Sequence, residues 1–430
     1  MLEKLFKLSE HGTSMRTEVI AGITTFLTMA YIIFVNPAIL ADTGMDRGAV
    51  FVATCLAAAA GCFIMGFIAN YPIALAPGMG LNAFFTYTVV LGMGHSWQVA
   101  LAAVFVSGLL FILLSLFKIR EWIINSIPMS LRTGISAGIG LFLAFIALKN
   151  AGIIVDNPAT LVSLGPITSL PCVLGALGFF LTIGLVYRNV TGAVMISILV
   201  ISALGLLLGN VQWAGQLVSL PPSIAPTFMQ LDFSALTDVG MVSVVFAFLF
   251  VDLFDTAGTL VGVAQKANLI GKDGKIPRLN RALLADSSAT AVGAVLGTSN
   301  TTSYIESASG VAAGGRTGLT AVVVGVLFLL ALFFAPLAGM IPAYATAGAL
   351  LYVSILMLSG LVHIDWHDLT EAAPVVVTCL MMPLTSSIAE GISMGFISYA
   401  VIKLFSGKVS AVSSSVWVMA IIFAVKYIVA

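Results

Sequence analysis

Charged residues are scarce in this chain. Of its 430 residues, 8% are charged and 60% are hydrophobic, whereas soluble globular domains carry about 25% charged residues. A chain of this composition has too much apolar surface for water, so we expect it to lie in a lipid bilayer. Basic and acidic residues balance, 18 against 18, which leaves no excess positive charge to bind nucleic acid. The sequence predicts an integral membrane protein and no nucleic-acid partner.

Clusters of metal-ligating or nucleophilic residues are also missing. The four cysteines occur singly in apolar runs without CxxC or Cys/His spacing, so we interpret them as small core residues and not as a disulfide frame or a zinc site. The four histidines fall in loops or near segment ends. No GxxxxGK[ST] loop is present, which excludes ATP hydrolysis by that route. We therefore predict no metal, no cofactor and no enzymatic centre.

Long apolar runs predict fourteen membrane spans, because a helix needs about 20 apolar residues to cross the hydrocarbon core. They lie at 17–40, 50–69, 73–92, 97–117, 130–149, 169–187, 190–209, 239–262, 281–298, 302–313, 316–338, 343–362, 371–385 and 388–405. A polar, proline-rich connection over 210–238 separates the first seven from the last seven. The final stretch 414–429 is apolar but short and is interrupted by Lys426, so whether it spans the bilayer stays open.

Lysines and arginines gather on one side of this arrangement. If the N-terminus is cytoplasmic, fifteen of the eighteen lie at cytoplasmic ends: Lys4, Lys7, Arg16, Lys118, Arg120, Arg132, Arg188, Lys266, Lys272, Lys275, Arg278, Arg281, Arg316, Lys403 and Lys408. Arg47 and Lys149 lie near the other side. Positive charge favours the cytoplasmic face, so we predict a multi-pass protein of the cell (inner) membrane with a cytoplasmic N-terminus.

The two halves resemble each other. AGIGLFLAFIALKNAGII (137–154) is similar to AGALLYVSILMLSGLVHI (347–364), and the third and tenth segments, PIALAPGMGLNAFF (72–85) and GAVLGTSNTTSYIESASG (293–310), are both interrupted by small or polar residues. Chance similarity between apolar stretches is the alternative. Since each half holds an odd number of spans, the copies would lie inverted in the membrane. Matching interruptions in inverted halves point to a transporter's binding site.

Acidic residues lie inside several predicted spans, where an ionisable group is costly and usually functional. Asp252 and Asp255 are spaced i, i+3 in span eight and so share one helix face. Glu306 follows the interruption in the tenth segment, and Asp286 begins the ninth. These four carboxylates are the candidate binding and coupling groups.

Structural roles are the alternatives for three of these acids. Ser303 and Glu306 have the spacing of a capping box, in which the carboxylate would only satisfy amides of its own helix. Asp286 could be an interfacial helix-start residue or the ion-pair partner of an arginine in the preceding loop. Asp252 could be a hydrogen-bond acceptor between packed helices. Small polar neighbours such as Thr256 and Thr259 favour a cavity wall around Asp255.

The two interruptions supply donors to match these acceptors. The turn at 77–80, followed by Asn82, offers backbone amides and a carboxamide, and the run at 301–303 can start a short helix that points the same way. A nucleobase suits such a site, because its N–H groups pair with carboxylates while its carbonyl accepts from amides. Buried carboxyl groups can also exchange protons. Coupling to a proton gradient is therefore a hypothesis.

Several motifs resemble the AzgA-like branch of the nucleobase–cation symporters. They are APGMGLNAFF (76–85), FLFVDLFDTAGTL (248–260), ADSSA (285–289), GTSNTTSYIES (297–307) and GGRTGLTAVVVG (314–325), and the likeness covers essentially the whole chain. The resemblance implies an all-α protein of fourteen spans in two inverted seven-span repeats. It also implies a core domain, 1–117 and 238–338, a gate domain, 118–237 and 339–430, a homodimer, and proton symport of purine bases.

The same resemblance implies Asn82, Asp255, Thr259, Tyr304 and Glu306 as substrate-binding residues, and it matches Asp286 to the acid of the ninth segment. Together with Asp252, which is a candidate because of its place in span eight, Asp255 and Asp286 are the residues expected for proton coupling or structural support. FVDLFDTAG and SNTTSYIES look more like the guanine/hypoxanthine type than the adenine type. The alternatives are an adenine-preferring permease and, more remotely, an anion transporter of the same architecture, which would want cationic residues where this chain has acids.

Overall fold

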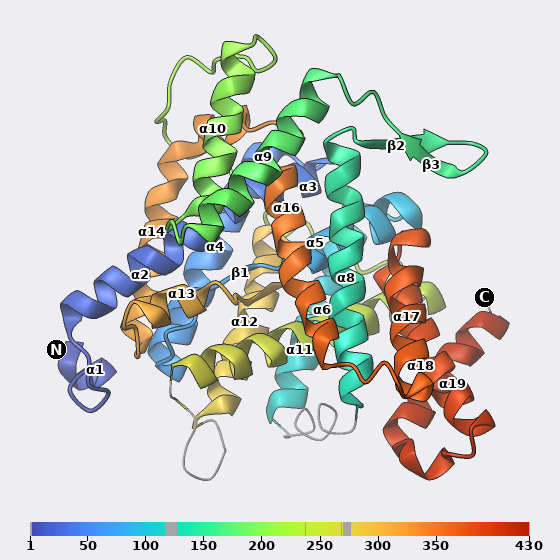
Figure 1. Cartoon of the computed structure of the whole chain (residues 1–430). Helices are drawn as coiled ribbons and strands as arrows, with labels where there is room; N and C mark the ends of the chain where they lie inside the picture. Colours follow the sequence, from blue (N-terminus) through green and yellow to red (C-terminus); the bar gives the residue numbers. More distant parts are fainter. Residues whose placement is uncertain (1, 117–126, 237, 268, 270–276, 430) are drawn as a thin grey trace.

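The structure is a computed structural model that describes residues 2–116, 127–236, 238–267, 269 and 277–429. Helices dominate the fold (Figure 1). Within the described residues, eight helices are long and apolar enough to cross a membrane, and shorter apolar helices accompany them. Lys118, Arg120, Lys272 and Lys275, which the charge pattern assigns to the cytoplasmic side, lie outside the described residues.

The first half of the chain forms elements that coincide with the seven predicted segments. They are α2 (Met15–Met29) with α3 (Ile32–Ala41), α4 (Arg47–Ile64) with the π-helix η1 (Met65–Ala69), β1 (Leu75–Pro77) with α5 (Met79–Ala83) and the π-helix η2 (Phe84–Gly92), α6 (Trp97–Leu116), α8 (Met129–Asn150), α9 (Leu170–Tyr187) and α10 (Ala193–Leu207). The short helix α1 (Leu2–Phe6) and the hairpin β2 (Ile154–Asn157) to β3 (Leu161–Leu164) were not predicted.

The second half repeats this order. Its elements are α11 (Val239–Lys266), α12 (Leu279–Leu296), β4 (Thr301–Ser303) with α13 (Ser307–Ala312), α14 (Gly318–Ala331) with η3 (Leu332–Phe334) and α15 (Ala335–Met340), α16 (Ala343–Leu358) with η4 (Ser359–His363), α17 (Leu369–Leu384) and α18 (Ile388–Phe405), followed by η5 (Val409–Ala411) and α19 (Ser414–Val429). Helices and broken elements thus occupy all fourteen predicted segments. The number that cross the bilayer stays a prediction.

Local signals in the sequence explain where several of these helices begin and end. Ser14 and Asp46 cap α2 and α4 by accepting hydrogen bonds from backbone N–H groups of the first turn, the usual role of such residues. Gly297 ends α12 with φ +98°, a conformation that side chains disfavour, and a Cβ there would lie 2.3 Å from Thr227. This glycine turns the chain back toward β4.

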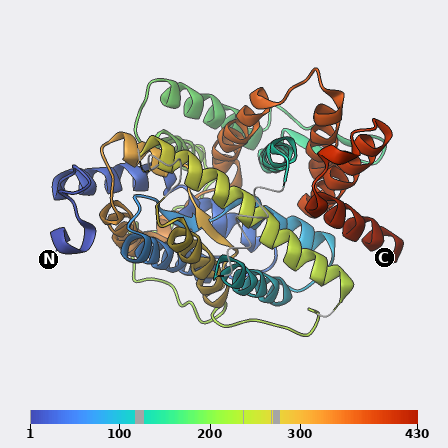
Figure 2. The same cartoon turned by 90° about the horizontal axis from the view of Figure 1, so that it is seen from below.

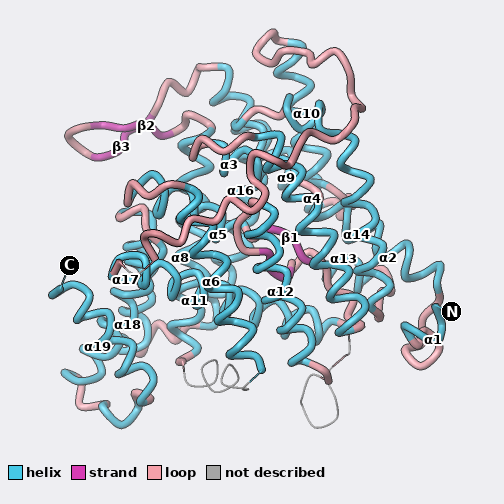
Figure 3. The backbone as a smooth tube through the Cα atoms, turned by 180° about the vertical axis from the view of Figure 1, so that it is seen from behind, coloured by secondary structure: helices cyan, strands magenta, loops and turns pink. Residues whose placement is uncertain are grey.

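The third and tenth segments meet in the middle of the protein. β1 and β4 pair antiparallel, with Ala76 opposite Thr302, and Figure 3 shows β1 at the centre while the β2–β3 hairpin lies at the edge. Every residue of both strands is buried. Extended backbone at membrane depth is tolerated only when its polar groups are paired, and the two strands satisfy each other. The predicted broken segments are confirmed.

The helices pack in two groups of neighbours. α12 lies against α4 and α6, and α14 lies against α2 and α4. In the other group α8 packs against α16 and α17, and α9 packs against α16 and α10. The long α11 crosses the underside of the molecule (Figure 2). The division of the chain into core and gate domains stays a prediction.

The C-terminal stretch left open by the sequence forms α19, which lies along α18. The rings of Phe396 and Phe423 are 5.8 Å apart, and the Tyr427 hydroxyl donates to Glu390. Phe423 precedes Tyr427 along α19, whereas its partner Phe396 follows Glu390 along α18, so the two helices run antiparallel.

Candidate functional site

Two backbone hydrogen-bond systems hold the paired strands in place. Gly78 N–H donates to the Asn300 carbonyl at 2.9 Å beyond one end of the sheet, and Tyr304 N–H donates to the Ala74 carbonyl at 3.0 Å beyond the other. Ala74 N–H donates in turn to the Ser307 hydroxyl at 3.0 Å. The starts of α5 and α13 are therefore fixed relative to each other.

Asp286 secures the end of β4. Its carboxylate accepts from both the N–H and the hydroxyl of Ser303, each at 2.9 Å, and from the Thr256 hydroxyl at 2.8 Å. It is fully buried and lies about two turns inside α12, which begins at Leu279. The alternative of an interfacial helix-start residue is therefore wrong. The sequence could not have revealed Ser303 as the partner, because 17 residues separate the two.

Asp252 is also buried among hydroxyl and amide donors. Its Oδ2 accepts from the Thr290 hydroxyl and from the Asn300 side chain, both at 3.2 Å. The Thr256 hydroxyl lies 3.4 Å from its Oδ1, 2.8 Å from Asp286 and 2.8 Å from the Thr302 hydroxyl. Thr256 thus joins α11, α12 and β4 through one oxygen atom.

Glu306 does not form the capping box that its sequence suggests. In such a box its carboxylate would accept from the Ser303 N–H, but that N–H donates to Asp286. Glu306 itself occupies the residue before α13, and its side chain makes no capping hydrogen bond. Its Oε1 accepts instead from the Tyr31 hydroxyl at 2.5 Å. The capping-box alternative is wrong.

Asp255 lies close to two other acids. It is half-buried, one turn beyond Asp252 in α11, and its carboxylate interacts electrostatically with Asp286 and Glu306. Like charges at low dielectric repel strongly, so a proton or a ligand rich in N–H donors would stabilise this group of carboxylates. Among the described residues, no three His, Cys, Asp or Glu side chains are placed to hold a metal ion.

The remaining predicted residues lie around the sheet. Asn82 is fully buried, and its Oδ1 accepts from the Ser299 hydroxyl, while its Nδ2 has no partner among the described residues. Tyr304 donates its hydroxyl to the Pro77 carbonyl at 2.6 Å and so braces β1 against β4. Thr259 lies one turn beyond Asp255 and is 7% exposed. Through Ser299, Asn82 contacts the segment that precedes β4, whereas Glu306 lies in the segment that follows β4.

Sequence reasoning missed two tyrosines near Glu306. Tyr31 lies at the junction of α2 and α3 and is fully buried. Tyr352, on α16, is half-buried and interacts electrostatically with Glu306. A tyrosine in an apolar span was the only available signal, and it is weak because buried tyrosines are common.

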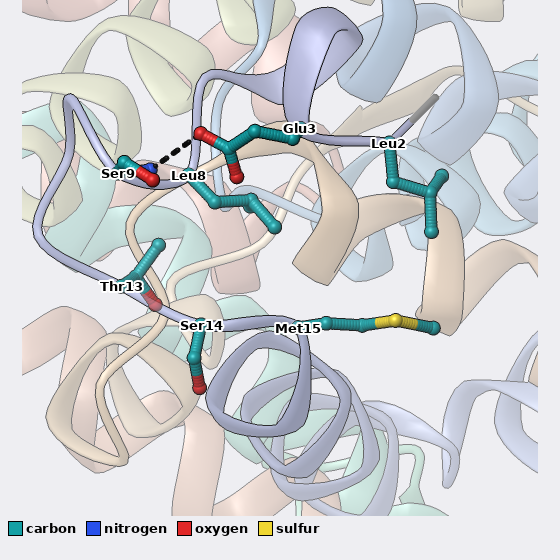
Figure 4. A pocket seen from close by; sticks show the side chains of 7 residues that line it. All are labelled: Leu2, Glu3, Leu8, Ser9, Thr13, Ser14 and Met15. Atoms are coloured by element: carbon teal, nitrogen blue, oxygen red, sulfur yellow. Dashed lines mark hydrogen bonds between the residues drawn. The ribbon is translucent and has the colours of Figure 1, made fainter.

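A separate pocket of about 540 Å³ lies at the start of the chain (Figure 4). Residues between Leu2 and Met15 line it, and Glu3 accepts there from the Ser9 N–H at 2.9 Å. The pocket contains none of the candidate site residues.

Comparison with known proteins identifies the class. The sequence model of a permease family matches residues 16–394. The chain is 53% identical to the adenine permease AdeP of Escherichia coli, over 100% of this chain and 96% of that protein. It is 50% identical to the guanine/hypoxanthine permease PbuG of Bacillus subtilis, over 99% of each.

Among solved structures, the transmembrane domain of the cyanobacterial bicarbonate transporter BicA matches with a TM-score of 0.64 and 14% identity. The match covers 89% of this chain and 97% of that one. Identity this low establishes the shared inverted-repeat fold and nothing about substrate. The family match and the long alignments establish a multi-pass membrane transporter and not an enzyme. The chain therefore belongs to the nucleobase–ascorbate transporter family of permeases, in its AzgA-like purine permease branch.

Proposed function

We propose that this chain is a proton-coupled symporter that imports purine bases, with guanine and hypoxanthine as its preferred substrates. The observation that carries the proposal is the placement of the Asp255 and Glu306 carboxylates together, beside the paired breaks of the third and tenth segments. Both are half-buried, whereas Asp252 and Asp286 are buried and engaged by neighbouring side chains.

A purine base matches the donors and acceptors around the sheet. Its ring N–H groups donate to the two carboxylates, and such charge-assisted hydrogen bonds are about twice as strong as neutral ones. The first N–H groups of α5 have no intrahelical acceptor, so they and the Asn82 Nδ2 can donate to a carbonyl of the base. The positive end of the helix dipole favours the same carbonyl.

The chemistry at the purine six-position favours guanine and hypoxanthine. Both carry a carbonyl there, which accepts from the available Asn82 donor, whereas adenine carries an amine. Adenine is the second candidate, because its amine can donate to either Asp255 or Glu306. The relatives include permeases named for each substrate at similar identity, 53% and 50%.

Proton coupling follows from the repulsion among the acids. Asp255 interacts with Asp286 and Glu306, and three ionised carboxylates in a low-dielectric site destabilise one another. One proton entering with the base would relieve this repulsion. Release of that proton to the cytoplasm would then favour release of the base, which links transport to the gradient.

Alternating access requires the predicted core and gate domains to move relative to each other. Under the predicted division, two close approaches would lie between the domains. A Cβ on Gly80 of α5 would lie 2.6 Å from Cγ2 of Ile139 on α8. The Thr88 hydroxyl of η2 donates to the Ser386 carbonyl at 2.7 Å.

Uptake measurements test the proposal. Cells that lack purine transporters and express this chain are expected to accumulate labelled hypoxanthine and guanine, adenine less, and uracil not at all, and a protonophore should abolish the uptake. Uptake of none of the bases, or uptake that ignores the gradient, would contradict proton symport.

Variants test the residues. Asp255→Asn and Glu306→Gln are expected to lose uptake while still reaching the membrane. Glu390→Gln is the matched control, because Glu390 also accepts from a tyrosine hydroxyl but lies on α18. Loss of uptake in the control as well would show that any such change disables the protein.

A further inference from the structure

Tyr31 lies at a break in the first predicted span. α2 ends at Met29 and α3 begins at Ile32, so the tyrosine occupies the turn between two helices and not a helix interior. Its side chain is fully buried. Its hydroxyl extends to Oε1 of Glu306 at 2.5 Å, although 275 residues separate them in the chain.

Close packing of α2 against α13 brings the two residues together. The Thr28 and Ser309 hydroxyls are 2.9 Å apart. Gly310 lies against α2 so closely that a Cβ would be 2.0 Å from the Thr25 hydroxyl oxygen. The absence of a side chain at this glycine permits the approach, and the hydroxyl pair keeps the register. The end of α2 is thereby held beside the start of α13.

The residues on both sides of Glu306 are also held. The Tyr304 N–H donates to the Ala74 carbonyl, and the Ser307 hydroxyl accepts from the Ala74 N–H, each at 3.0 Å. The remaining freedom of Glu306 is the rotation of its side chain, which costs rotamer entropy to restrict. A hydrogen bond to one carboxylate oxygen restricts that rotation before any ligand arrives.

We infer that Tyr31 is a positioning residue for substrate: it holds Oε1 of Glu306 so that Oε2 is presented to an N–H group of the base. Tyr31 is fully buried while Glu306 is half-buried, so the tyrosine lies behind the carboxylate and acts through it. This inference rests on the proposed function. It adds a residue of the first span to a site so far built from the third, eighth and tenth.

The test is Tyr31→Phe, which removes the hydroxyl and keeps the ring. A hydrogen bond to a charged group is usually worth more than one between neutral groups. We therefore expect KM for hypoxanthine to rise about tenfold, which corresponds to about 1.4 kcal/mol, while Vmax stays within about twofold of wild type. Tyr399→Phe is the matched control, since the buried Tyr399 also donates to a glutamate, Glu371, at 3.2 Å, but between α18 and α17.

Inhibition by methylated bases separates positioning from general stabilisation. Hypoxanthines methylated at each ring nitrogen in turn are compared as inhibitors of uptake. In the wild type, methylation of the nitrogen whose N–H donates to Glu306 should weaken binding strongly. In Tyr31→Phe this loss of affinity should shrink about tenfold. The losses of affinity on methylation at the other nitrogens, and all of those measured in Tyr399→Phe, should stay as in the wild type.

Replacement of Tyr31 by para-aminophenylalanine keeps the ring and restores an N–H donor, so it should recover part of the lost affinity. If Tyr31→Phe fails to reach the membrane, the para-aminophenylalanine variant is measured in its place. Its KM for hypoxanthine and its loss of affinity for the methylated base are then expected to lie within about threefold of the wild-type values. An unchanged KM in Tyr31→Phe, or an equal loss for every methylated base, would overturn the inference. Absence of purine uptake by the wild type would instead refute the proposed function.

Discussion

Replacement of Asp286 tests whether this acid supports the break or carries the coupled proton. Its carboxylate receives three hydrogen bonds, two from Ser303 and one from Thr256. Asp286→Ala removes the two oxygens that accept all three hydrogen bonds and leaves the Ser303 N–H buried without that partner. An unsatisfied buried donor costs about 1–3 kcal/mol. Because three hydrogen bonds lose their acceptor, we expect destabilisation at the upper end of that range.

Asp286→Asn should be milder. The asparagine oxygen can still accept from the Ser303 N–H, so only the Thr256 bond and the charge are lost, at about 1–3 kcal/mol. If Asp286 is a structural support, the asparagine variant retains hypoxanthine uptake at reduced Vmax and still requires the proton gradient.

The assay combines thermal unfolding of the purified protein in detergent with uptake into energised vesicles. The expected order of unfolding temperature is wild type, then Asp286→Asn, then Asp286→Ala. An asparagine variant with wild-type stability that exchanges bases but no longer accumulates them would refute the structural role and assign proton coupling to Asp286.

Two further changes probe packing and charge. Gly80→Ala places a Cβ 2.6 Å from Cγ2 of Ile139, so we expect normal insertion but a several-fold lower Vmax; a wild-type Vmax would show that these surfaces do not move past each other. The pKa of Asp368 lies below its usual value because the side chains of Thr370 and then Lys408 donate to it. Its stabilising contribution is present at neutral pH and is lost on acidification below about 4, so Asp368→Asn should flatten the fall in unfolding temperature there, and an unchanged slope would contradict this.

The sequence predicted features that depend on local composition. Apolar length located the helices, and the interruptions near Gly78 and Thr302 located the central strands. The cost of acids in a membrane singled out Asp255 and Glu306. Each of these signals is contained within a short stretch of chain, so one sequence was sufficient to find it.

Features that depend on distant contacts were not predictable in the same way. The capping-box spacing of Glu306 is a real local pattern, but Asp286 accepts the hydrogen bond that the pattern requires. Tyr31 has no local signal, because its role depends on the packing of α2 against α13. The β2–β3 hairpin was missed because its short run of polar and apolar residues resembles an ordinary loop.

Chemical protection of the carboxylates tests the central claim most directly. The purified protein is treated with a hydrophobic carbodiimide, with and without saturating hypoxanthine, and modification at Asp255, Glu306 and Glu390 is quantified by mass spectrometry. We predict that hypoxanthine protects Asp255 and Glu306, that uracil protects neither, and that Glu390 reacts equally in all samples. Modification of Asp255 and Glu306 that is unaffected by hypoxanthine would contradict a purine site at the paired breaks.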